Sequence, residues 1–446
     1  MNNKYFVLKA NGQIVEPDKY LEAGQCSESF RVFIEREAFN KKLESEAKSD
    51  YAFYAKKLGF DWEPNSDSGF MRFDYKAHLI MRLVKEYARQ LVGEIGFPIY
   101  EVRGANFFDM SYPVVQAYAG LYGDRLFHLN AGNKKLVMSY DASYPQFNLA
   151  SKYQLRDKHL PFAHFSLSDC YRLEQSGECM LFVRQRRFFM PDLHPYFKDI
   201  DEAFKWFPKI EKKLLESVKD ANREYEIVVE VSSEENWAKY QWEIKDIAKN
   251  LGQDILVAII RDGQDRYWII NVDYKIIDQL GQSREICCIQ IDVGNASRLG
   301  IQYEDKNNKK HFPAIIHSAV PGGIERYLYM LFDNFKESFP LWLYPSQIRL
   351  VPVSQKHISF CKRLVEKSRS LPVRIEIDDR DEHINKKIKQ AHEDLVPLVI
   401  VIGDKEVSSK EKLKEFNAAL SRVIKKSKNK PFIALSYPNL ISMQVK

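Results

Sequence analysis

Residues 169–194 read DCYRLEQSGECMLFVRQRRFFMPDLH, and this stretch decides the fold of the middle of the chain. Apolar residues alternate with polar ones on both sides, and Gly177 lies where the tip of a hairpin is expected. The sequence therefore predicts two antiparallel strands joined by a loop. Arginines on one face of such a pair suit a polyphosphate, because each guanidinium offers a fixed fork of N–H donors. The alternative is a solvated hairpin with surface arginines. The polar side chains to which both interpretations apply are Arg172, Glu174, Arg184, Arg186, Asp192 and His194.

The composition predicts two or three domains. A chain of 446 residues exceeds one typical domain, and 45% hydrophobic content is enough for two cores. The net charge of +6 permits a polyanionic partner without requiring one. Six cysteines without CxxC spacing argue against a disulfide framework and a cysteine-only zinc site, so a reducing, cytoplasmic setting is expected. We expect no membrane association, since no signal-peptide core and no apolar run near the roughly 20 residues that span a bilayer are present.

The periodicity of apolar residues divides the chain into three parts. Residues 1–60 are expected to form a lead-in or linker. Residues 61–337 combine helical spacing over 74–93 and 201–224 with strand-like runs between 225 and 317. These runs follow in close order without a helix between them in our interpretation, which predicts a largely antiparallel sheet. Within 338–446, strands alternate with helices, as in a βαβ domain.

Three blocks call for one explanation: the arginine stretch, the strand EICCIQID at 285–292, and IIHSAVPGGIERYLYMLF at 315–332. Together they resemble the class II aminoacyl-tRNA synthetases, and more closely the archaeal-type threonyl-tRNA synthetases. FDWEPNSDSGFMRFDYKAHLI at 60–80 and DDRDEHINKKIKQAHEDLVPLVIVIGDKE at 378–406 add to this similarity. The resemblance implies an α+β fold, with an antiparallel sheet flanked by helices in a catalytic domain at 61–337. It also implies an α/β anticodon-binding domain at 338–446.

Motif by motif, the resemblance implies an ATP site. Arg172 matches the arginine that holds the α-phosphate and the amino acid carboxylate, and Arg326 matches the arginine over the far face of adenine and the γ-phosphate. These two are the expected catalytic residues. Paired arginines with Mg²⁺ neutralise the repulsion between the attacking carboxylate and the phosphate without a covalent catalyst. The other expected ATP-binding residues are Glu174, Arg184, Phe188, Glu285 and Gln290.

The resemblance also implies an amino acid pocket. In the family, a zinc ion held by one cysteine and two histidines grips the substrate's amino and hydroxyl groups, which excludes valine. His194 and His317 match the two histidines, but Ser143 takes the place of the cysteine, and serine is a poor zinc ligand. One interpretation is that the thiol of Cys287 or Cys288 replaces the missing zinc ligand. The alternative is that both cysteines are small hydrophobic residues of the core. The expected amino acid-binding residues are Asp192, Gln290 and Trp268, although Trp268 and Asn271 replace a tyrosine and a lysine of bacterial relatives.

The remaining expectations concern partners. A homodimer is expected, although Ala105 takes the place of the family's interface proline. Arg380, Glu382 and Lys389 fall where the family reads the anticodon, and such charged side chains suit the edges of unstacked bases. The first 60 residues match only the family's linker, so we expect no editing domain, with serine mischarging cleared by a separate protein or prevented in the pocket.

The sequence thus predicts a threonine–tRNA ligase that uses ATP and Mg²⁺, with zinc as a further expected ion, and that acts on threonine and tRNA(Thr). Two alternatives stay open. One is a paralogue that activates a different amino acid, which Ser143, Trp268 and Asn271 motivate. The other is a non-catalytic tRNA-binding or regulatory protein that kept the fold. Retention of both Arg172 and Arg326 argues against it, because a binding protein has no use for two arginines that flank ATP.

Overall fold

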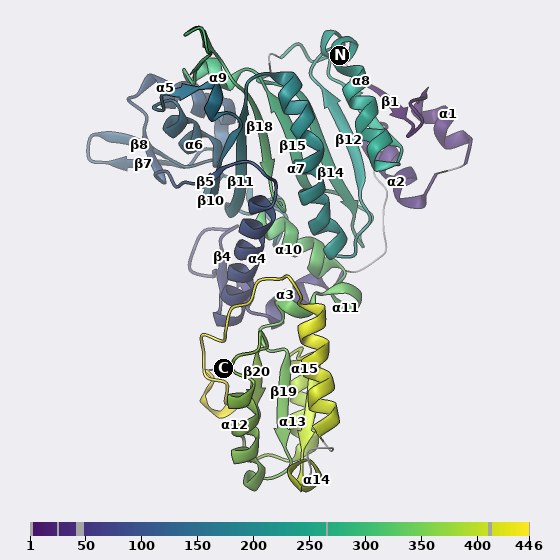
Figure 1. The fold of residues 1–446 in the computed structure, drawn as a ribbon, viewed down its shortest axis with the longest axis vertical. Helices are drawn as coiled ribbons and strands as arrows, with labels where there is room; N and C mark the ends of the chain where they lie inside the picture. The colour runs from purple at the N-terminus through teal and green to yellow at the C-terminus, as the bar shows by residue number, and fades with distance from the viewer. Residues whose placement is uncertain (1–2, 25, 42–48, 265, 409–412, 446) are drawn as a thin grey trace. The chain divides into compact units, whose positions relative to one another are not determined.

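The computed structural model describes residues 3–24, 26–41, 49–264, 266–408 and 413–445, which form two compact units (Figure 1). The first unit comprises residues 1–49, 66–70 and 91–333, and the second comprises residues 50–65, 71–90 and 334–446. We describe each unit by itself. No helix in the described part of the chain has the length and apolar composition that a membrane-spanning segment needs.

A mixed sheet of ten strands organises the first unit, and most of its neighbouring strands are antiparallel. The predicted hairpin is confirmed: β10 and β11 pair along their length, from Phe162 with Tyr196 to Tyr171 with Arg187. The N-terminal strand β1 pairs with β13, so the start of the chain extends this sheet. In spatial order the strands are β2 (Ile14–Val15), β1 (Lys4–Leu8), β13 (Ile255–Ile259), β12 (Glu226–Val231), β14 (Trp268–Ile277), β15 (Ser283–Asp292), β18 (Ala314–Ala319), β11 (Arg187–Phe197), β10 (Phe162–Tyr171) and β5 (Ile99–Glu101).

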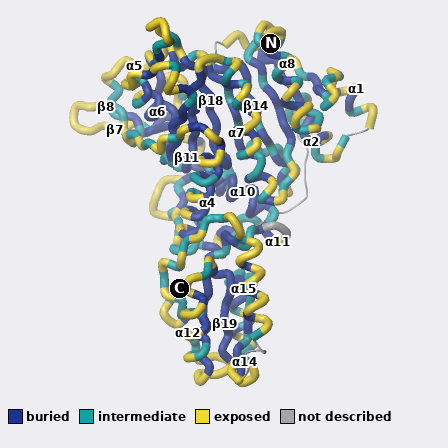
Figure 2. Tube along the Cα trace, viewed as in Figure 1, coloured by how far each residue is buried: buried dark blue, intermediate teal, exposed yellow. Residues whose placement is uncertain are grey.

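Two long helices, α7 (Ile200–Asp220) and α8 (Glu234–Leu251), cover one face of this sheet (Figure 1). The apolar stripe of α7 that the sequence predicts includes Phe207, Ile210 and Leu214, and all three are buried. Figure 2 shows the strands beneath these helices as the most deeply buried part of the unit. The core of the first unit therefore lies between the sheet and α7 with α8.

The expectation that no helix separates the strand-like runs was wrong. Helix α8 lies between β12 and β13, and these two strands are parallel, as a crossover through a helix requires. Signals for this helix are present at both ends. The Ser233 hydroxyl accepts a hydrogen bond from the Asn236 amide, and Gly252 ends the helix in the left-handed region at φ 66°.

Shorter elements complete the first unit. A small core of Tyr118, Tyr140 and Phe147 with their neighbours supports helices α5 and α6 beside the sheet. These elements are α1 (Pro17–Glu22), α2 (Glu28–Glu37), β6 (Phe107–Asp109), α5 (Pro113–Ala119), β7 (His128–Ala131), β8 (Lys134–Met138), α6 (Ser143–Ala150), β9 (Leu155–Arg156), α9 (Asn295–Arg298), β16 (Tyr303–Glu304), β17 (Lys310–His311) and α10 (Ile324–Asp333).

A buried carboxyl group on α7 predicts how stability depends on pH. Burial raises the pKa of Glu211 to about 7, and the Tyr274 hydroxyl donates to its Oε1 at 2.6 Å. A raised carboxyl pKa gives stability that is complete below the unfolded value and is lost as pH rises through 7. We expect Glu211→Gln to keep the tyrosine hydrogen bond and to remove about 3 kcal/mol of the fall in unfolding free energy between pH 4.5 and 8. Urea unfolding at both pH values measures this. Glu216→Gln, on the exposed side of the same helix, should leave the pH dependence unchanged.

The second unit contains the predicted βαβ arrangement, which is confirmed. Its sheet has the order β20 (Ile375–Ile377), β19 (Ile348–Pro352) and β21 (Leu398–Ile402), with all pairs parallel. Apolar residues of these strands and of the helices, among them Cys361, Phe416 and Val423, form its core. The other elements are α3 (Tyr51–Lys57), β3 (Phe60–Trp62), β4 (Met71–Phe73), α4 (Tyr75–Gly93, which belongs to this unit up to residue 90), α11 (Phe335–Ser338), α12 (Ile358–Lys367), α13 (Ile384–Glu393), α14 (Asp404–Ser408) and α15 (Lys414–Lys426).

One fully buried arginine holds two carboxylates together in this unit. Arg349 is 1% exposed and contacts Glu376 at 2.9 Å and Asp394 at 2.6 Å. Arg349→Met would leave buried negative charge without its cation, so we expect a loss of about 3–5 kcal/mol in the stability of this unit. Chemical unfolding followed by circular dichroism measures it. Arg363→Met, on the exposed face of α12, is the control and should change stability little; an equal loss in both would contradict the assignment.

Candidate active site on the central sheet

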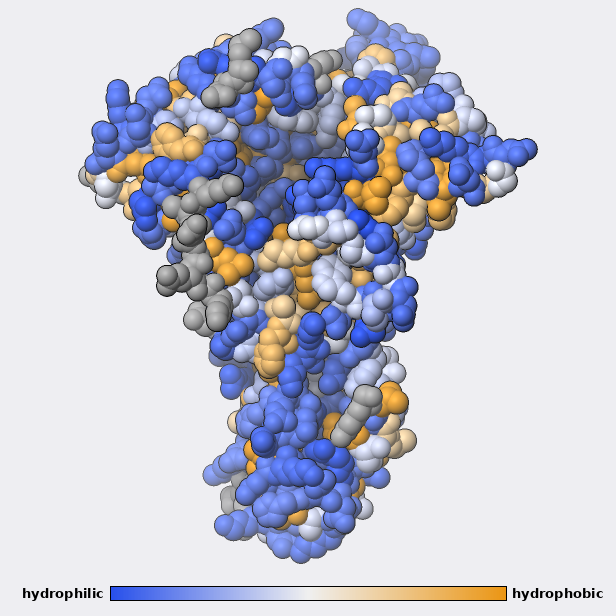
Figure 3. Space-filling view, turned by 180° about the vertical axis from the view of Figure 1, so that it is seen from behind, coloured by the Kyte–Doolittle hydropathy of each residue, from blue (hydrophilic) through white to orange (hydrophobic). Residues whose placement is uncertain are grey.

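The candidate site lies on the sheet face opposite α7. Because side chains alternate along β14 and Tyr274 points to Glu211 of α7, Asn271 and Asp273 point to the other face. A cavity of about 320 Å³ opens there, lined by residues of β11, β15, β18 and the start of α10. Figure 3 views this face, which is hollowed at its middle and mainly hydrophilic around the hollow.

Arg172 enters the cavity from the loop between β10 and β11. Its Nε donates to the carbonyl oxygen of Tyr140 at 3.1 Å, which fixes the guanidinium. The guanidinium carbon lies 5.1 Å from the ring centre of Phe188 and 5.4 Å from that of Tyr122, within the range of cation–π attraction. Arg172 and Phe188, both predicted for the ATP site, therefore line one wall together.

The same loop carries a second group of charges. Arg184 forms an ion pair with the buried carboxylate of Glu174 at 3.0 Å, and both residues line the cavity. Arg186 is buried, donates from Nε to the carbonyl oxygen of Glu174 at 2.8 Å and pairs with Asp67. Arg186 thus holds the loop in shape, whereas Arg184 keeps its guanidinium partly exposed to the cavity.

Glu285 on β15 and Arg326 on α10 line the same cavity as Arg172. Their side chains pair at 2.9 Å. Burial opposes the ionised form of Glu285, but the Arg326 guanidinium lowers its pKa overall. Burial and the charge of Glu285 raise the pKa of Asp273 to about 8.

The glycine before α10 packs against the sheet rather than opening the backbone to a ligand: a Cβ at Gly322 would lie 2.1 Å from the carbonyl oxygen of Ile286.

A row of polar side chains crosses five neighbouring strands beneath the cavity, and two of its members, Gln290 and His317, line the cavity itself. The register pairs His164 with His194, Gln290 with His317, and Asn271 with Gln290. The β11–β18 register, with Leu193 opposite Ser318, brings His194 opposite His317. The Gln290 amide oxygen also accepts from the Tyr267 hydroxyl at 3.0 Å. Residues far apart in sequence thus form one continuous polar floor.

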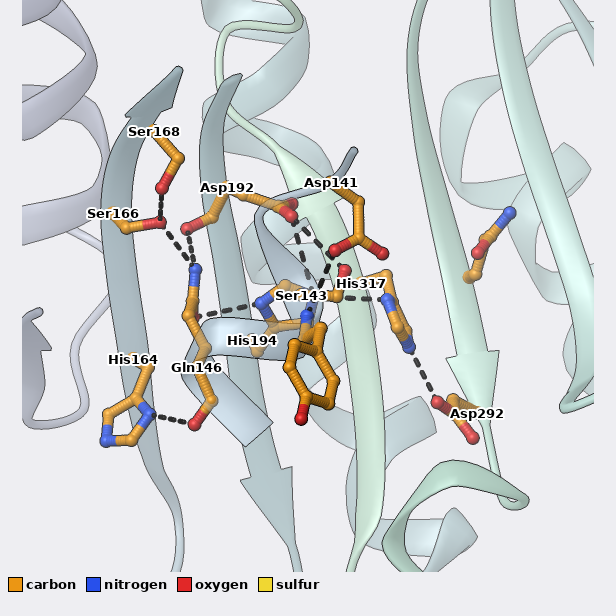
Figure 4. A network of polar contacts seen from close by, with 12 residues as sticks. Asp141, Ser143, Gln146, His164, Ser166, Ser168, Asp192, His194, Asp292 and His317 are labelled. Atoms are coloured by element: carbon orange, nitrogen blue, oxygen red, sulfur yellow. Dashed lines mark hydrogen bonds and ion pairs between the residues drawn. The ribbon is translucent and has the colours of Figure 1, made fainter. Parts of the chain in front are cut away.

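Hydrogen bonds fix both predicted metal-binding histidines (Figure 4). His194 Nε2 lies 3.1 Å from His317 Nδ1, and His317 Nε2 lies 2.6 Å from Asp292 Oδ2. His194 Nδ1 lies 3.0 Å from Oε1 of Gln146, a residue of α6. His194 is fully buried and also packs edge-on against Phe147. The structure thus brings the two histidines together, as predicted.

The expected set of one cysteine and two histidines is not formed by the described residues. Ser143, at the cysteine position, lines the cavity, and its hydroxyl lies 3.5 Å from Asp192 Oδ2. Cys287 is 3% exposed, and the Cys288 thiol gathers with the carboxylates of Asp273 and Glu285, with the ligand atoms within 4.8 Å of one another. That trio is the only group of three potential metal ligands so close together among the described histidine, cysteine and carboxylate side chains.

The structure places one predicted pocket residue elsewhere. Trp268 is largely buried and does not line the cavity in the described part of the chain, whereas Tyr267 does. The pairing of β14 with β15 shifts by one residue after Trp268. This irregularity lies between Tyr267 and Asn271, so simple strand alternation does not identify Tyr267.

Asp141 and Gln146 were also missed by sequence reasoning. Asp141 lines the cavity, accepts from the Tyr122 hydroxyl at 2.7 Å, and has its pKa raised by burial. Burial likewise raises the pKa of Asp192 to about 7. No local motif identifies Asp141 or Gln146, because their roles depend on long-range packing of the segment around α6 against β11.

The predicted anticodon residues lie in the second unit, in the loop after β20 and on α13. Arg380 pairs with Asp378 at 2.6 Å, and Glu382 pairs with Lys386 at 2.6 Å. Lys389 lies on α13 and lines a shallow open groove along that helix. Its ammonium is 3.7 Å from Glu393, so it is held weakly and remains exposed to a ligand.

Comparisons with known proteins agree with this geometry. Residues 131–335 match the tRNA synthetase class II core domain (G, H, P, S and T), and residues 347–425 match an anticodon binding domain. The threonine–tRNA ligase of Nanoarchaeum equitans is 38% identical over 433 residues, 94% of this chain and 68% of that relative. The ligase of Staphylothermus marinus is 34% identical over 461 residues, 99% of this chain and 74% of that relative.

Solved structures share the fold. A Cryptosporidium parvum structure described as the RNA binding domain of threonyl-tRNA synthetase has a TM-score of 0.71 at 18% identity, covering 81% of this chain and 90% of that one. Giardia lamblia prolyl-tRNA synthetase in complex with prolyl-adenylate has a TM-score of 0.65 at 13% identity, covering 86% and 83%. Family models, relatives and fold agree, and the chain belongs to the threonine–tRNA ligases, within the class II aminoacyl-tRNA synthetases.

Proposed function

We propose that this chain activates threonine with ATP, releasing pyrophosphate, and transfers the threonyl group to tRNA(Thr). The observation that carries the proposal is the meeting of Arg172, Arg326 and Asp192 at one cavity of the central sheet. The two guanidinium groups suit the anionic phosphates of ATP. The buried carboxylate suits the ammonium and hydroxyl groups of the amino acid.

In the activation step, the amino acid carboxylate attacks the α-phosphorus of ATP and pyrophosphate leaves. Both reactants are anions, so the main barrier is charge repulsion and alignment. Arg172 is already fixed by Tyr140 and the flanking ring of Phe188, and it would neutralise charge at the α-phosphate without reorganising. Arg326, which pairs with Glu285, would bind the distal phosphates. Arg184, which pairs with Glu174, would contact the outer edge of the nucleotide.

Mg²⁺ belongs to the proposal as the partner of ATP. The carboxylates of Asp273 and Glu285 are the hard oxygen ligands beside Arg326 that would hold it, and they fit such an ion, whereas the Cys288 thiol is a soft ligand and does not. When bound, Mg²⁺ supplies charge neutralisation to the phosphates.

In the transfer step, a hydroxyl of the terminal ribose of tRNA attacks the activated carbonyl and AMP leaves. The second unit would select the tRNA. Lys389→Ala is expected to lower kcat/KM for tRNA charging by about tenfold and to leave threonine-dependent pyrophosphate exchange unchanged, because Lys389 lies in that unit and outside the catalytic cavity. Lys362→Ala, on the exposed face of α12, is the matched control. A parallel loss in exchange would contradict a role confined to tRNA.

The proposal includes a homodimer in the cytoplasm. Strand β5 forms one edge of the ten-stranded sheet, and Tyr100 on it is 57% exposed, so this edge suits contact with a second copy. All six cysteines are free thiols, which suits a reducing compartment. Light scattering tests the dimer directly: a monomer at micromolar concentration would contradict it.

The direct test of the proposed activity is the charging of tRNA(Thr) with radioactive threonine in the presence of ATP. Charging with threonine, and not with valine, is the expected result. A second candidate, activation of a different amino acid, is favoured by Ser143, which lines the cavity, whereas Trp268 and Asn271 do not line it among the described residues. The same assay with other amino acids distinguishes the two.

A further inference from the structure

The two buried histidines at the cavity floor have fixed proton positions. Gln146 donates from Nε2 to the Ser166 hydroxyl at 2.8 Å and to the carbonyl oxygen of Asp192 at 3.1 Å. This orients the amide, so its Oε1 accepts, and His194 Nδ1 must carry the proton at that contact. At this contact His194 is therefore the hydrogen-bond donor.

Asp292 fixes the other ring. Its carboxylate accepts from the backbone amides of Gly294 and Asn295 and from the Asn295 side chain, all within 2.9 Å. It is held as an acceptor, so His317 Nε2 must carry the proton at 2.6 Å. The inward nitrogens, His194 Nε2 and His317 Nδ1, then face each other at 3.1 Å with only lone pairs of their own. Two facing lone pairs are what a metal ion bound by both histidines would use, so the other donors nearby decide whether the pair can hold one.

The donors around this pair decide against a metal. Zinc sites take at least three protein ligands of sulfur, nitrogen or carboxylate oxygen. Ser143 offers a hydroxyl, which is a poor ligand, and the Cys288 thiol gathers with Asp273 and Glu285 instead. The Asp192 carboxylate is 3.7 Å from His194 Nε2 but forms no close trio with the two described histidines.

We propose that this chain selects its amino acid without zinc: His194 and His317 lack a third metal ligand among the described residues, and Ser143 with Asp192 receives the substrate's polar groups. This inference rests on the proposed function and concerns the same cavity. Asp192 is 8% exposed and Ser143 also 8%, so a substrate hydroxyl or ammonium there pairs with groups that are otherwise desolvated. Valine is disfavoured because it keeps the ammonium but lacks the hydroxyl, so it leaves one of these two buried groups without a substrate partner.

The experiment measures zinc by mass spectrometry in the full chain, purified from zinc-supplemented cells and passed through gel filtration. The wild-type chain is expected to hold less than about 0.1 zinc per chain, and Ser143→Cys about one, because a thiolate completes the ligand set with the two histidines. Ser168→Cys is the matched control: it adds a thiol to the same polar network beside Ser166, outside the cavity lining, and should stay at the wild-type value.

Zinc content decides this inference, and threonine-dependent exchange decides the proposed function. Zinc-free wild-type chain that exchanges threonine in the presence of 1,10-phenanthroline supports both. About one zinc per wild-type chain, removed by the chelator together with exchange, overturns the inference and leaves the function standing. A folded Ser143→Cys chain without zinc also overturns it. If circular dichroism shows that this variant does not fold, the wild-type zinc content with the chelator experiment decides alone.

Discussion

Arg172→Ala is expected to lower threonine-dependent pyrophosphate exchange by about 10³-fold, at the upper end of losses for one preorganised transition-state donor. Arg172 is a cation fixed in the cavity lining, since Tyr140 holds its Nε and two rings flank its guanidinium. Its loss removes charge neutralisation where the carboxylate meets the phosphate. Initial rates of exchange at saturating ATP and threonine measure the effect.

Arg187→Ala is the matched control for this variant. Arg187 lies on the adjoining strand β11, pairs with Asp169 at 2.6 Å and does not line the cavity among the described residues. Exchange in the control should stay near wild type. Arg172→Lys should recover activity only in part, because an ammonium lacks the planar fork. A folded Arg172→Ala chain with exchange within about threefold of wild type would sink the assigned role.

Arg326→Ala is expected to lower exchange by about 10²-fold. This residue opens α10 and pairs with Glu285 at 2.9 Å, so its removal takes away a cation for ATP and also leaves Glu285 unneutralised. The second effect alone would inhibit binding of a polyphosphate. The two contributions need separate measurement.

Comparing the double variant Arg326→Ala with Glu285→Gln against Glu285→Gln alone separates them, because Glu285 is itself a proposed Mg²⁺ ligand. If Arg326 contacts ATP, exchange in the double variant falls well below that of Glu285→Gln, because removing the carboxylate does not restore a phosphate ligand. Equal exchange in the two would show that Arg326 acts only by neutralising Glu285. Stopped-flow or equilibrium binding of ATP gives the matching affinity change.

The sequence predicted most of the sheet because its signals are local. Strand alternation on both sides of Gly177 located the β10–β11 hairpin, and alternating strands and helices located the second unit. Helix α8 was missed although Ser233 and Gly252 are ordinary end signals, because the apolar strands on both sides dominated the interpretation. The parallel β12–β13 pairing follows from that helix and was missed with it.

The candidate site was predictable where a motif carries its own chemistry. Arg172, Glu285 and Arg326 were identified in this way, and the structure brings them to one cavity. Gln146 and Asp292 were not identified, because each acts by orienting a histidine from a distant element. Their roles depend on the register of strands and the placement of α6, which local periodicity does not encode.

Pyrophosphate exchange across all twenty amino acids tests the central claim most directly. The purified full chain, with ATP and Mg²⁺, is expected to exchange with threonine well above every other amino acid, and Arg172→Ala is expected to abolish that signal while Arg187→Ala keeps it. A folded chain that binds ATP but exchanges best with a different amino acid, or with none, would contradict the account.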